Sequence, residues 1–248
     1  MLCQRFIRNE TFPSRFNLTT LVQLPKKASA QELDNKRFIH MKEWLPRLVE
    51  ALTVQPMKAD IFSTGTKYQI GGCPGKRTVF HLCVVKSNIA YKTLNGQGVI
   101  LTLLDLIKYF DKQSLIDACD ALHKAKVNNK FYRVWYQLNS RTEIEVRTGE
   151  GVTARGLAGP VTGQGGGGAA LASALNLDLG LKRYFEDSID EEYYGSVRLQ
   201  PLAYIDDITR SNHDVNAVRA GNEKFSSLAL EKQMKFYPRK SCFLVLGT

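Results

Sequence analysis

Two adjacent aspartates, Asp206 and Asp207, lie between apolar residues in the carboxyl-terminal part of this sequence. The apolar residues before the pair, and Ile208 after it, predict two short strands with the acids at or near the turn between them. Neighbouring carboxylates are not easily buried unless a cation neutralises them, and hard divalent cations are the usual partners of clustered carboxylate oxygens. For the pair alone, a solvated Asp-Asp turn is the better interpretation, so the choice depends on what lies upstream.

A third carboxylate, Asp105, lies at the end of a buried strand predicted over residues 99–106. If a neighbouring Asp-Asp hairpin faces this strand end, three carboxylates surround one point. Such a cluster suits two divalent metal ions about 3.5–4 Å apart, which stabilise both oxygens of an in-line phosphoryl displacement. Alone, Asp105 is better explained as a helix or turn cap; beside Asp206 and Asp207, the metal-binding interpretation is favoured.

The positive charge of the chain is concentrated in its first part. Its 248 residues, enough for one large domain or two modest ones, carry a formal net charge of +10. Residues 1–100 have 15 Lys and Arg against 6 Asp and Glu, whereas residues 101–248 have 19 against 18. Scattered lysines usually form a solvated surface, but a one-sided excess favours a polyanionic partner, with nucleic acid ahead of a membrane.

The five cysteines are scattered and form no C-x-x-C pair, which argues against a disulfide framework and a structural zinc site. A reducing intracellular compartment is the simplest interpretation, with the choice between nucleus and cytoplasm left open. The four histidines are equally dispersed, and we assign none as a ligand. No apolar run is long enough to span a bilayer, and residues 1–20 do not resemble a signal peptide, so we expect no membrane partner.

Predicted strands and helices alternate, which indicates an α+β or α/β layer architecture. A glycine run at 163–168 lacks the phosphate-loop pattern, and we expect close approach of backbone to a base or sugar there rather than a flexible linker. Loops are predicted at 28–36 and 65–78, with an acidic exposed loop at 183–195. Beside the hairpin, we predict strands at 16–24, 99–106, 142–148 and 242–246, and helices at 41–53, 79–94, 114–125, 129–138, 169–179 and 223–232.

Six sequence blocks, in order and spanning about residues 20–247, resemble those of reverse transcriptases, especially of non-LTR retrotransposons. The stretch 104–112 (LDLIKYFDK) is similar to the first catalytic block, and 204–207 (YIDD) to the second acidic block. The other four matches are 24–27 (LPKK) with 35–39 (NKRFI), 69–78 (QIGGCPGKRT), 163–165 (GQG), and 238–247 around Lys240. The chain departs from the family's pattern at Phe38, 72–73 and 166–170, positions tied to primer–template binding more than to the chemistry.

The resemblance implies an α+β fold with the fingers and palm of a right-hand polymerase, in which an antiparallel palm sheet carries the catalytic carboxylates. Fingers would span 1–98 and palm 99–248, truncated before the thumb. The implied reaction is RNA-directed DNA synthesis, in which a primer 3′-OH is extended with dNTPs on an RNA template. Two Mg²⁺ ions, with Mn²⁺ as a substitute, would serve as cofactors, and RNA template, DNA primer and dNTP as partners.

The resemblance also implies roles for single residues. Asp105 and Asp206 would hold the metal ions, Asp207 would belong to the same cluster, and Lys240 would protonate the leaving pyrophosphate. Phe110 would exclude a ribose 2′-OH, although an ordinary core phenylalanine is at least as good an interpretation. The residues implied to contact the nucleotide or template are Lys26, Lys27, Arg37, Gln164 and Gly165; for the lysines, a solvated basic face is an equal alternative.

Two other functions stay open at this point. The chain could be a non-catalytic, nucleic-acid-binding relic of a retroelement polymerase, which would keep the fold and the positive charge. It could also be a different two-metal phosphotransferase built on a similar palm.

Overall fold

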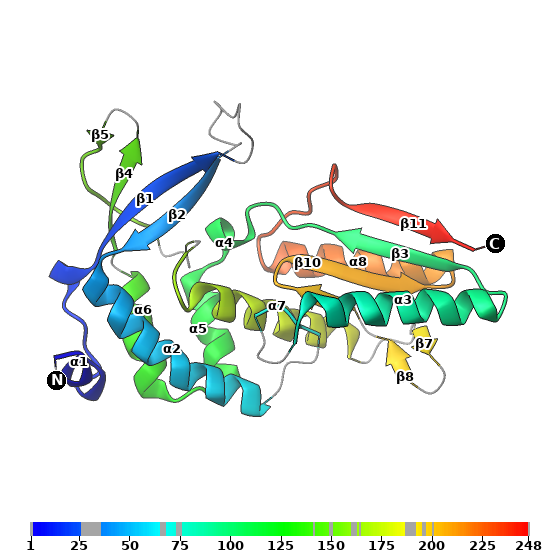
Figure 1. Cartoon of the computed structure of the whole chain (residues 1–248), viewed down its shortest axis with the longest axis horizontal. Helices are drawn as coiled ribbons and strands as arrows, with labels where there is room; N and C mark the ends of the chain where they lie inside the picture. Colours follow the sequence, from blue (N-terminus) through cyan, green and yellow to red (C-terminus); the bar gives the residue numbers. More distant parts are fainter. Residues whose placement is uncertain are drawn as a thin grey trace. The chain divides into compact units, whose positions relative to one another are not determined.

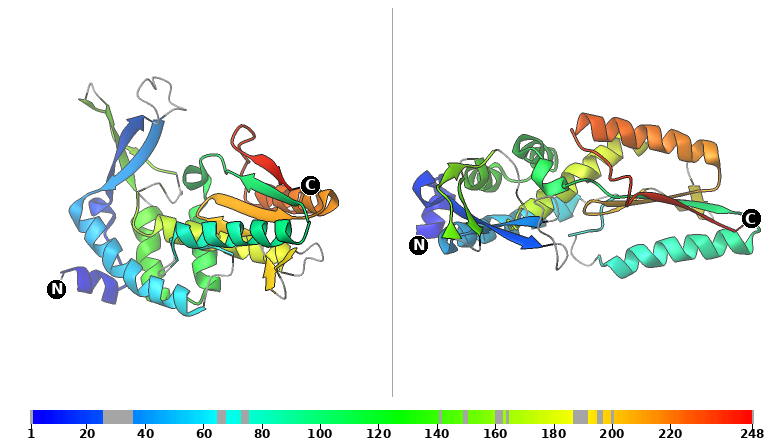
Figure 2. Two further views of the ribbon diagram at one scale, coloured as in Figure 1. Left: turned by 45° about the vertical axis from the view of Figure 1, so that its right-hand side comes forward. Right: turned by 90° about the horizontal axis from the view of Figure 1, so that it is seen from above.

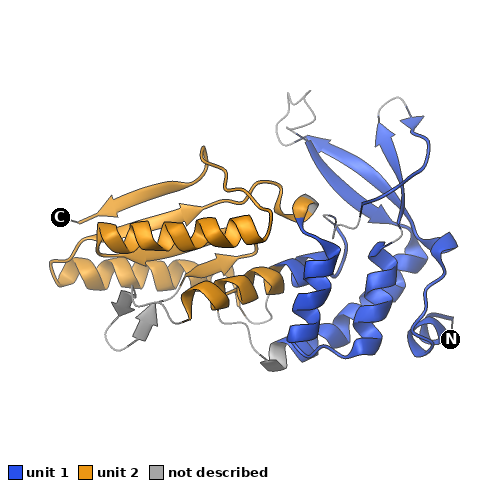
Figure 3. Cartoon of the chain, turned by 180° about the vertical axis from the view of Figure 1, so that it is seen from behind, with its two compact units in different colours: residues 1–64, 113–173 blue, residues 65–112, 174–248 orange. Residues whose placement is uncertain are grey.

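The computed structural model of the protein (Figure 1) describes residues 2–25, 36–64, 68–72, 76–140, 142–148, 151–159, 163, 165–186, 192–194, 197–199 and 201–247. The chain divides into two compact units, each made of two separate stretches (Figure 3). Unit 1 comprises Met1–Thr64 and Gln113–Ser173, and unit 2 comprises Gly65–Lys112 and Ala174–Thr248. The units therefore do not follow the division predicted between residues 98 and 99, and the names fingers and palm stay predictions.

The sheet of unit 1 has the strand order β2-β1-β4-β5, and β6 also pairs with β4. Strand β1 pairs antiparallel with β2 and parallel with β4. The strand β2 was not predicted from the sequence: the loop expected at 28–36 ends at its first residue, the helix expected at 41–53 begins at its last two, and residues 37–40 were assigned to no element. The strands are β1 (Leu18–Pro25), β2 (Lys36–Lys42), β4 (Glu143–Thr148), β5 (Gly151–Val152) and β6 (Gly156–Leu157).

The helices of unit 1 bury their apolar faces against one another. Val49 from one helix and Val134 and Leu138 from another form a core with Phe12 and Leu45. Ser114 caps one helix, because its side chain accepts a hydrogen bond from the backbone N–H of Ile116. The elements are α1 (Leu2–Arg8), η1 (Ser14–Phe16), α2 (Trp44–Thr64), α5 (Leu115–Lys124) and α6 (Asn129–Ser140).

Unit 2 contains an antiparallel four-stranded sheet in the order β11-β3-β10-β9. The predicted hairpin is present, and the last predicted strand has the bounds that were expected. The sheet confirms an α+β architecture. Its strands are β3 (Val99–Leu104), β9 (Leu202–Tyr204), β10 (Asp207–Asn212) and β11 (Cys242–Leu246).

Helices cover both faces of this sheet: α3 (Thr78–Leu94) lies on one face and α8 (Val215–Glu231) on the other (Figure 2). On the α8 side, Ile208 of β10 packs in a buried core with Leu177, Leu181, Phe225 and Leu228. Since side chains alternate along a strand, Asp207 points toward the α3 side. A short helix, α4 (Tyr109–Lys112), follows β3, and α7 (Ala169–Phe185) begins in unit 1 and continues in unit 2.

Two further predictions concern the ends of elements and loops. The exposed loop predicted at 183–195 is partly wrong, because α7 continues to Phe185 and a strand pair follows, β7 (Glu192–Tyr194) and β8 (Val197–Leu199). The loop predicted at 28–36 lies almost entirely outside the described residues. None of the helices in the described part of the chain is long and apolar enough to cross a membrane.

Candidate active site at the Asp206–Asp207 hairpin

The acid pair lies on a tight hairpin between β9 and β10. Tyr204 pairs with Asp207 across the hairpin, so that Ile205 and Asp206 form a two-residue turn. Ile205 has φ = 61°, which is rare for a β-branched residue. The Asp206 side chain is half-buried in the turn, whereas Asp207 is exposed at the start of β10. The sequence prediction that the acids lie at a turn is confirmed.

Asp105 is brought beside this pair by the sheet. Ile208 of β10 pairs with Leu104 of β3, and Asp105 and Asp207 lie one residue beyond that pair on their two strands. The backbone of Asp105 is fixed from the β11 side: its N–H donates to Ser241 Oγ (3.2 Å), and its carbonyl accepts from the Tyr237 N–H (2.8 Å).

Lys240 completes a row of charges across three neighbouring segments. Its Nζ donates to Asp105 Oδ2 at 2.9 Å. The lysine is 61% exposed and the carboxylate 20% exposed, so water screens this ion pair only in part. We call Lys240, Asp105, Asp206 and Asp207 the acid row. The structure thus brings together all four residues that were predicted to be catalytic.

Burial and neighbouring carboxylates disfavour the ionised forms of Asp206 and Asp207. Burial raises the pKa of Asp206, and the neighbouring charges of Asp207 and Asp105 raise it further. Burial also raises the pKa of Asp207, again with Asp105 adding to the effect, while Lys240 acts in the opposite direction on both groups. The hydrogen bond to Asp105 in turn raises the pKa of Lys240. At this end of the sheet three carboxyl groups are thus balanced by only one lysine among the described residues.

The acid row offers the ligand type that a divalent cation needs, but it is not a closed metal cage. Within the residues described, no group of three or more His, Cys, Asp or Glu side chains is arranged so that it could hold a metal ion. In this arrangement the partner of Asp105 is the Lys240 ammonium. Mg²⁺ is usually held by one or two carboxylates together with substrate phosphates and water, so the oxygen donors present fit such an ion.

Two buried residues that the sequence analysis gave no role hold the hairpin turn. The Gln69 side chain bonds both the N–H and the carbonyl of Ile205. Asp178 of α7 accepts hydrogen bonds from the backbone of Tyr68 and Gln69. A lone carboxylate in an otherwise apolar helical stretch was the one available signal for Asp178. Gln69 had no comparable signal, although it lies in one of the matched blocks.

Aromatic residues of unit 2 lie close to the acid row. Tyr109 is buried, and burial raises its pKa, with the charge of Asp206 as a second cause. Phe110 is half-buried and packs edge-to-face on Tyr109, with 5.8 Å between ring centroids. From α3, the buried His81 lies close enough to Asp207 to feel its charge; burial lowers the pKa of His81 and Asp207 opposes this. Phe110 thus packs against Tyr109, and its exclusion of a ribose 2′-OH stays a prediction.

The remaining predicted residues belong to unit 1. Arg37 is an exposed residue of β2, and Gly165 has φ = 111° and lies against the backbone of His40 in the same strand. The glycine segment therefore approaches protein backbone closely, as expected of glycines, and the predicted contact with a base or sugar stays a prediction. Lys26, Lys27 and Gln164 lie outside the described residues.

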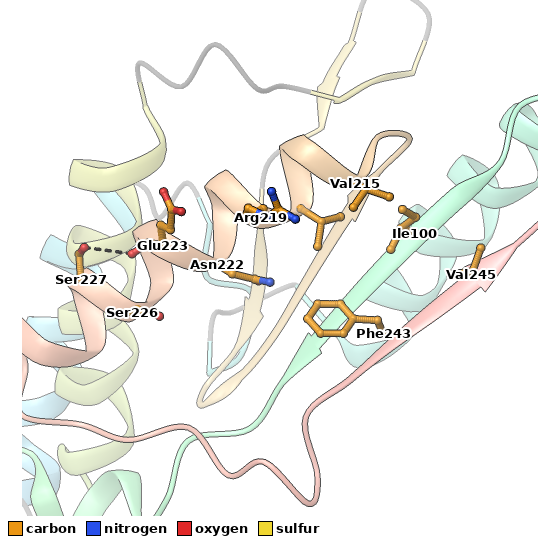
Figure 4. A pocket seen from close by; sticks show the side chains of 10 residues that line it. Ile100, Val215, Arg219, Asn222, Glu223, Ser226, Ser227, Phe243 and Val245 are labelled. Carbon is orange, nitrogen blue, oxygen red and sulfur yellow. Dashed lines mark hydrogen bonds between the residues drawn. The ribbon is translucent and has the colours of Figure 1, made fainter.

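The cavity drawn in Figure 4 is separate from the acid row. It has a volume of about 690 Å³ and lies between α8 and the strands β3 and β11, where Ile100, Phe243 and Val245 face Val215 and Arg219. By the strand register, Ile100 lies on the same face of the sheet as Ile208, and Asp207 lies on the other face. The cavity is therefore on the opposite face of the sheet from Asp207.

Comparison with known proteins places the fold. No protein-family model matches the sequence, and no curated protein matches it either. Apo telomerase from Candida tropicalis, truncated from its C-terminal domain, aligns with a TM-score of 0.65 at 11% identity over 95% of this chain and 51% of that chain. Telomerase from Candida albicans in complex with a TWJ fragment of telomeric RNA gives 0.65 at 10% identity over 98% and 45%.

A third structure, telomerase from Candida tropicalis with a TWJ fragment of telomeric RNA, gives a TM-score of 0.67 at 10% identity over 98% of this chain and 44% of that chain. The chain therefore spans about half the length of these solved chains. Telomerase catalytic subunits are reverse-transcriptase-like polymerases, so the chain has a reverse-transcriptase-like fold at a coarse level. These neighbours do not support the non-LTR retrotransposon type specifically.

Proposed function

We propose that this chain is the polymerase portion of an RNA-directed DNA polymerase, which extends a primer 3′-OH with dNTPs on an RNA template. The observation that carries the proposal is the acid row: three carboxylates and one lysine converge at a hairpin of an antiparallel sheet, within a telomerase-like fold. Phosphoryl transfer of this kind depends mainly on positioning and charge neutralisation, which divalent cations held by such a row, together with Lys240, would supply.

Each member of the acid row has a distinct task in this proposal. Asp105 and Asp206 would hold two Mg²⁺ ions, or Mn²⁺ in their place, and Asp207 would add negative charge beside them. When bound, the metal ions would act as Lewis acids on the attacking and leaving oxygens of the in-line displacement. Lys240 carries a proton close to Asp105 and would deliver it to the leaving pyrophosphate.

The nucleic-acid partners follow from charge and from the structural neighbours. Two of the aligned telomerases were solved with a fragment of telomeric RNA, which supports an RNA partner for this chain. The basic residues 1–100 would follow the phosphate backbone, so binding would be salt-sensitive and largely independent of sequence. Lys26, Lys27 and Arg37 would bind the triphosphate, and Gln164 and Gly165 would contact nucleotide and template. The non-LTR retrotransposon origin rests on the sequence blocks alone.

A second function is favoured by one observation. The Lys240 ammonium is the partner of Asp105 in this structure, and a lysine bound in this way competes with a metal ion for the same oxygen. A non-catalytic relic that binds nucleic acid would keep this ion pair permanently. A polymerase would exchange it for metal ions when the substrate phosphates arrive.

Single-nucleotide extension of an annealed primer on an RNA template, with Mg²⁺, separates these functions. We expect incorporation by the wild type and its loss in Asp206→Asn, with retained activity in the control Asp120→Asn, an exposed carboxylate of α5. Template binding without incorporation would establish the relic. Phosphoryl transfer to an acceptor other than a primer would establish a different phosphotransferase.

The same assay tests Phe110. If its ring excludes a ribose 2′-OH, the wild type will prefer dNTPs, and Phe110→Ala will accept ribonucleotides more readily. Equal use of ribonucleotides and deoxynucleotides by the wild type would reject this role and leave Phe110 as a packing partner of Tyr109.

A further inference from the structure

The short segment Tyr68–Gly71 forms an additional edge to the sheet of unit 2, directly beside the turn of the acid row. Gln69 makes an isolated parallel bridge with Ala203 of β9. The Ala203 N–H donates to the Tyr68 carbonyl (2.8 Å), and the Ile70 N–H donates to the Ala203 carbonyl (2.9 Å). Pairing stops there, because Ile205 leaves the strand conformation at the turn.

The Gln69 side chain continues this pairing where the backbone cannot. Its Oε1 accepts from the Ile205 N–H (2.7 Å), and its Nε2 donates to the Ile205 carbonyl (3.0 Å). The same oxygen accepts from the Gly71 N–H at 2.8 Å. Only one orientation of the amide satisfies all three contacts, so the carboxamide is fixed. One buried side chain thus holds both the N–H and the carbonyl group of Ile205, and so both peptide units that flank this turn residue.

The backbone conformation of Ile205 is unfavourable by itself and requires these contacts. A β-branched residue at φ = 61° is strained, typically by about 1–3 kcal/mol, and persists only when its surroundings over-determine it. Gly71 allows the close approach, because a Cβ at that position would lie 2.5 Å from the backbone nitrogen of Ile205. The strained residue directly precedes Asp206.

The position of Gln69 is fixed by Asp178. The Oδ1 atom of this buried carboxylate accepts from the backbone N–H groups of Tyr68 and Gln69, both at 2.7 Å. These two hydrogen bonds fix the backbone of two consecutive residues of the segment. The segment is therefore attached to helix α7 on one side and to the hairpin turn on the other.

From these contacts we infer that Gln69 is a positioning residue for the acid row, held by Asp178, and that it sets where the Asp206 carboxylate points. The inference rests on the proposed function, because Gln69 would position Asp206 for the metal ions that the proposal places at the acid row. Residues behind metal ligands orient them, and their loss typically weakens metal binding by about 10- to 100-fold.

Two variants test the inference, each with a matched control. Gln69→Met keeps the length of the side chain but removes all three hydrogen bonds, and Gly71→Ala pushes directly against the Ile205 backbone. The controls are Gln55→Met, at an exposed position of α2, and Gly156→Ala, where an added Cβ meets nothing within 4 Å. Each protein is titrated with Mn²⁺ by electron paramagnetic resonance, and the exchange rate of the Ile205 amide is measured by NMR.

We expect Gln69→Met and Gly71→Ala to bind Mn²⁺ about 10- to 100-fold more weakly than the wild type and to exchange the Ile205 amide faster, with both controls unchanged. Wild-type Mn²⁺ affinity in a folded Gln69→Met or Gly71→Ala protein would overturn the inference and leave the proposed function standing. Absence of Mn²⁺ binding to the wild type would instead count against the proposed function. In that case the exchange rate of the Ile205 amide still tests the positioning role of Gln69. An exchange rate unchanged from the wild type in both Gln69→Met and Gly71→Ala would overturn that role.

Discussion

At the scale of single residues, the acid row brings carboxylates together at a place where the folded protein without metal ions disfavours their ionised forms. Asp206 is half-buried and adjoins two other carboxylates, and one lysine faces the group. Function and stability therefore oppose each other at this site: the charge that would attract a metal ion destabilises the folded protein in its absence.

This opposition predicts how Asp206→Asn changes the pH dependence of stability. The folded-state pKa of Asp206 is raised above its unfolded value, so the folded protein binds the proton more tightly, and stability falls as pH rises through the interval between the two values. Without divalent cations, we expect Asp206→Asn to melt at a higher temperature than the wild type at pH 7. The gain should vanish as pH falls below the ordinary aspartate value of about 3.9. A gain that is independent of pH would contradict this, and Asp120→Asn is the control.

A second residue with a steric role is Gly168, directly before α7. A Cβ at this position would overlap the buried indole of Trp135, only 2.1 Å from Nε1. We expect Gly168→Ala to lower the free energy of unfolding by about 1–3 kcal/mol, measured by urea denaturation. Gly159→Ala, where nothing lies within 4 Å of an added Cβ, should stay within about 0.5 kcal/mol of the wild type. An equal change in the free energy of unfolding for Gly168→Ala and Gly159→Ala would contradict this, because it would show that the Trp135 indole moves aside without measurable destabilisation.

At the scale of elements, a buried polar cluster joins β2, α2, α6 and the glycine segment within unit 1. Lys42 Nζ donates to Glu50 Oε2 (3.1 Å) and to Asn139 Oδ1 (2.9 Å). The other carboxylate oxygen, Glu50 Oε1, accepts from Trp135 Nε1 (3.2 Å) and from the Gly168 N–H (3.3 Å). Through Glu50, the cluster fixes the end of the glycine segment to α2 and joins α2 to β2.

We predict that the stability of the protein depends on both partners of the ion pair between Lys42 and Glu50. Lys42→Met leaves a buried, uncompensated carboxylate, and we expect it to destabilise the protein by about 3–5 kcal/mol in urea denaturation. The double variant Lys42→Met/Glu50→Gln should recover part of this loss, because the amide oxygen still accepts from Trp135 and Gly168. Lys124→Met, in an exposed ion pair, should change stability by less than about 1 kcal/mol. A double variant no more stable than Lys42→Met would contradict this account.

Elements with a local signal were predictable from the sequence, and those defined by distant contacts were not. The helices α3, α5 and α6 have regular apolar spacing or a cap, and the strand β11 is a continuous apolar run; all four were placed closely. The strand β2 mixes charged and apolar residues and is defined by its pairing with β1. The start of α8 was missed, because its cap, Asp214, bonds the Ala217 N–H without the glutamate of a capping box.

At the scale of the whole molecule, the carboxylates could be predicted because each lies next to an apolar strand. Asp105 is far in sequence from the adjacent pair Asp206 and Asp207, yet the strand pairing brings it beside them. The pairing of Gln69 with Ile205 joins residues 136 positions apart and has no periodicity that the sequence could reveal. The division into two interleaved units was equally hidden, because it depends on contacts between stretches that are distant in the chain.

The central claim is that the acid row carries out templated DNA synthesis, and template-directed incorporation tests it most directly. Four RNA templates that differ only in the first unpaired base are each offered all four dNTPs with Mg²⁺, and the added nucleotide is identified by mass spectrometry. We expect the complementary nucleotide in each case, with a rate at least about 100-fold lower in Asp206→Asn, because charge stabilisation by the metal is worth several kcal/mol. Incorporation that ignores the template base, or that persists in Asp206→Asn, would contradict the account.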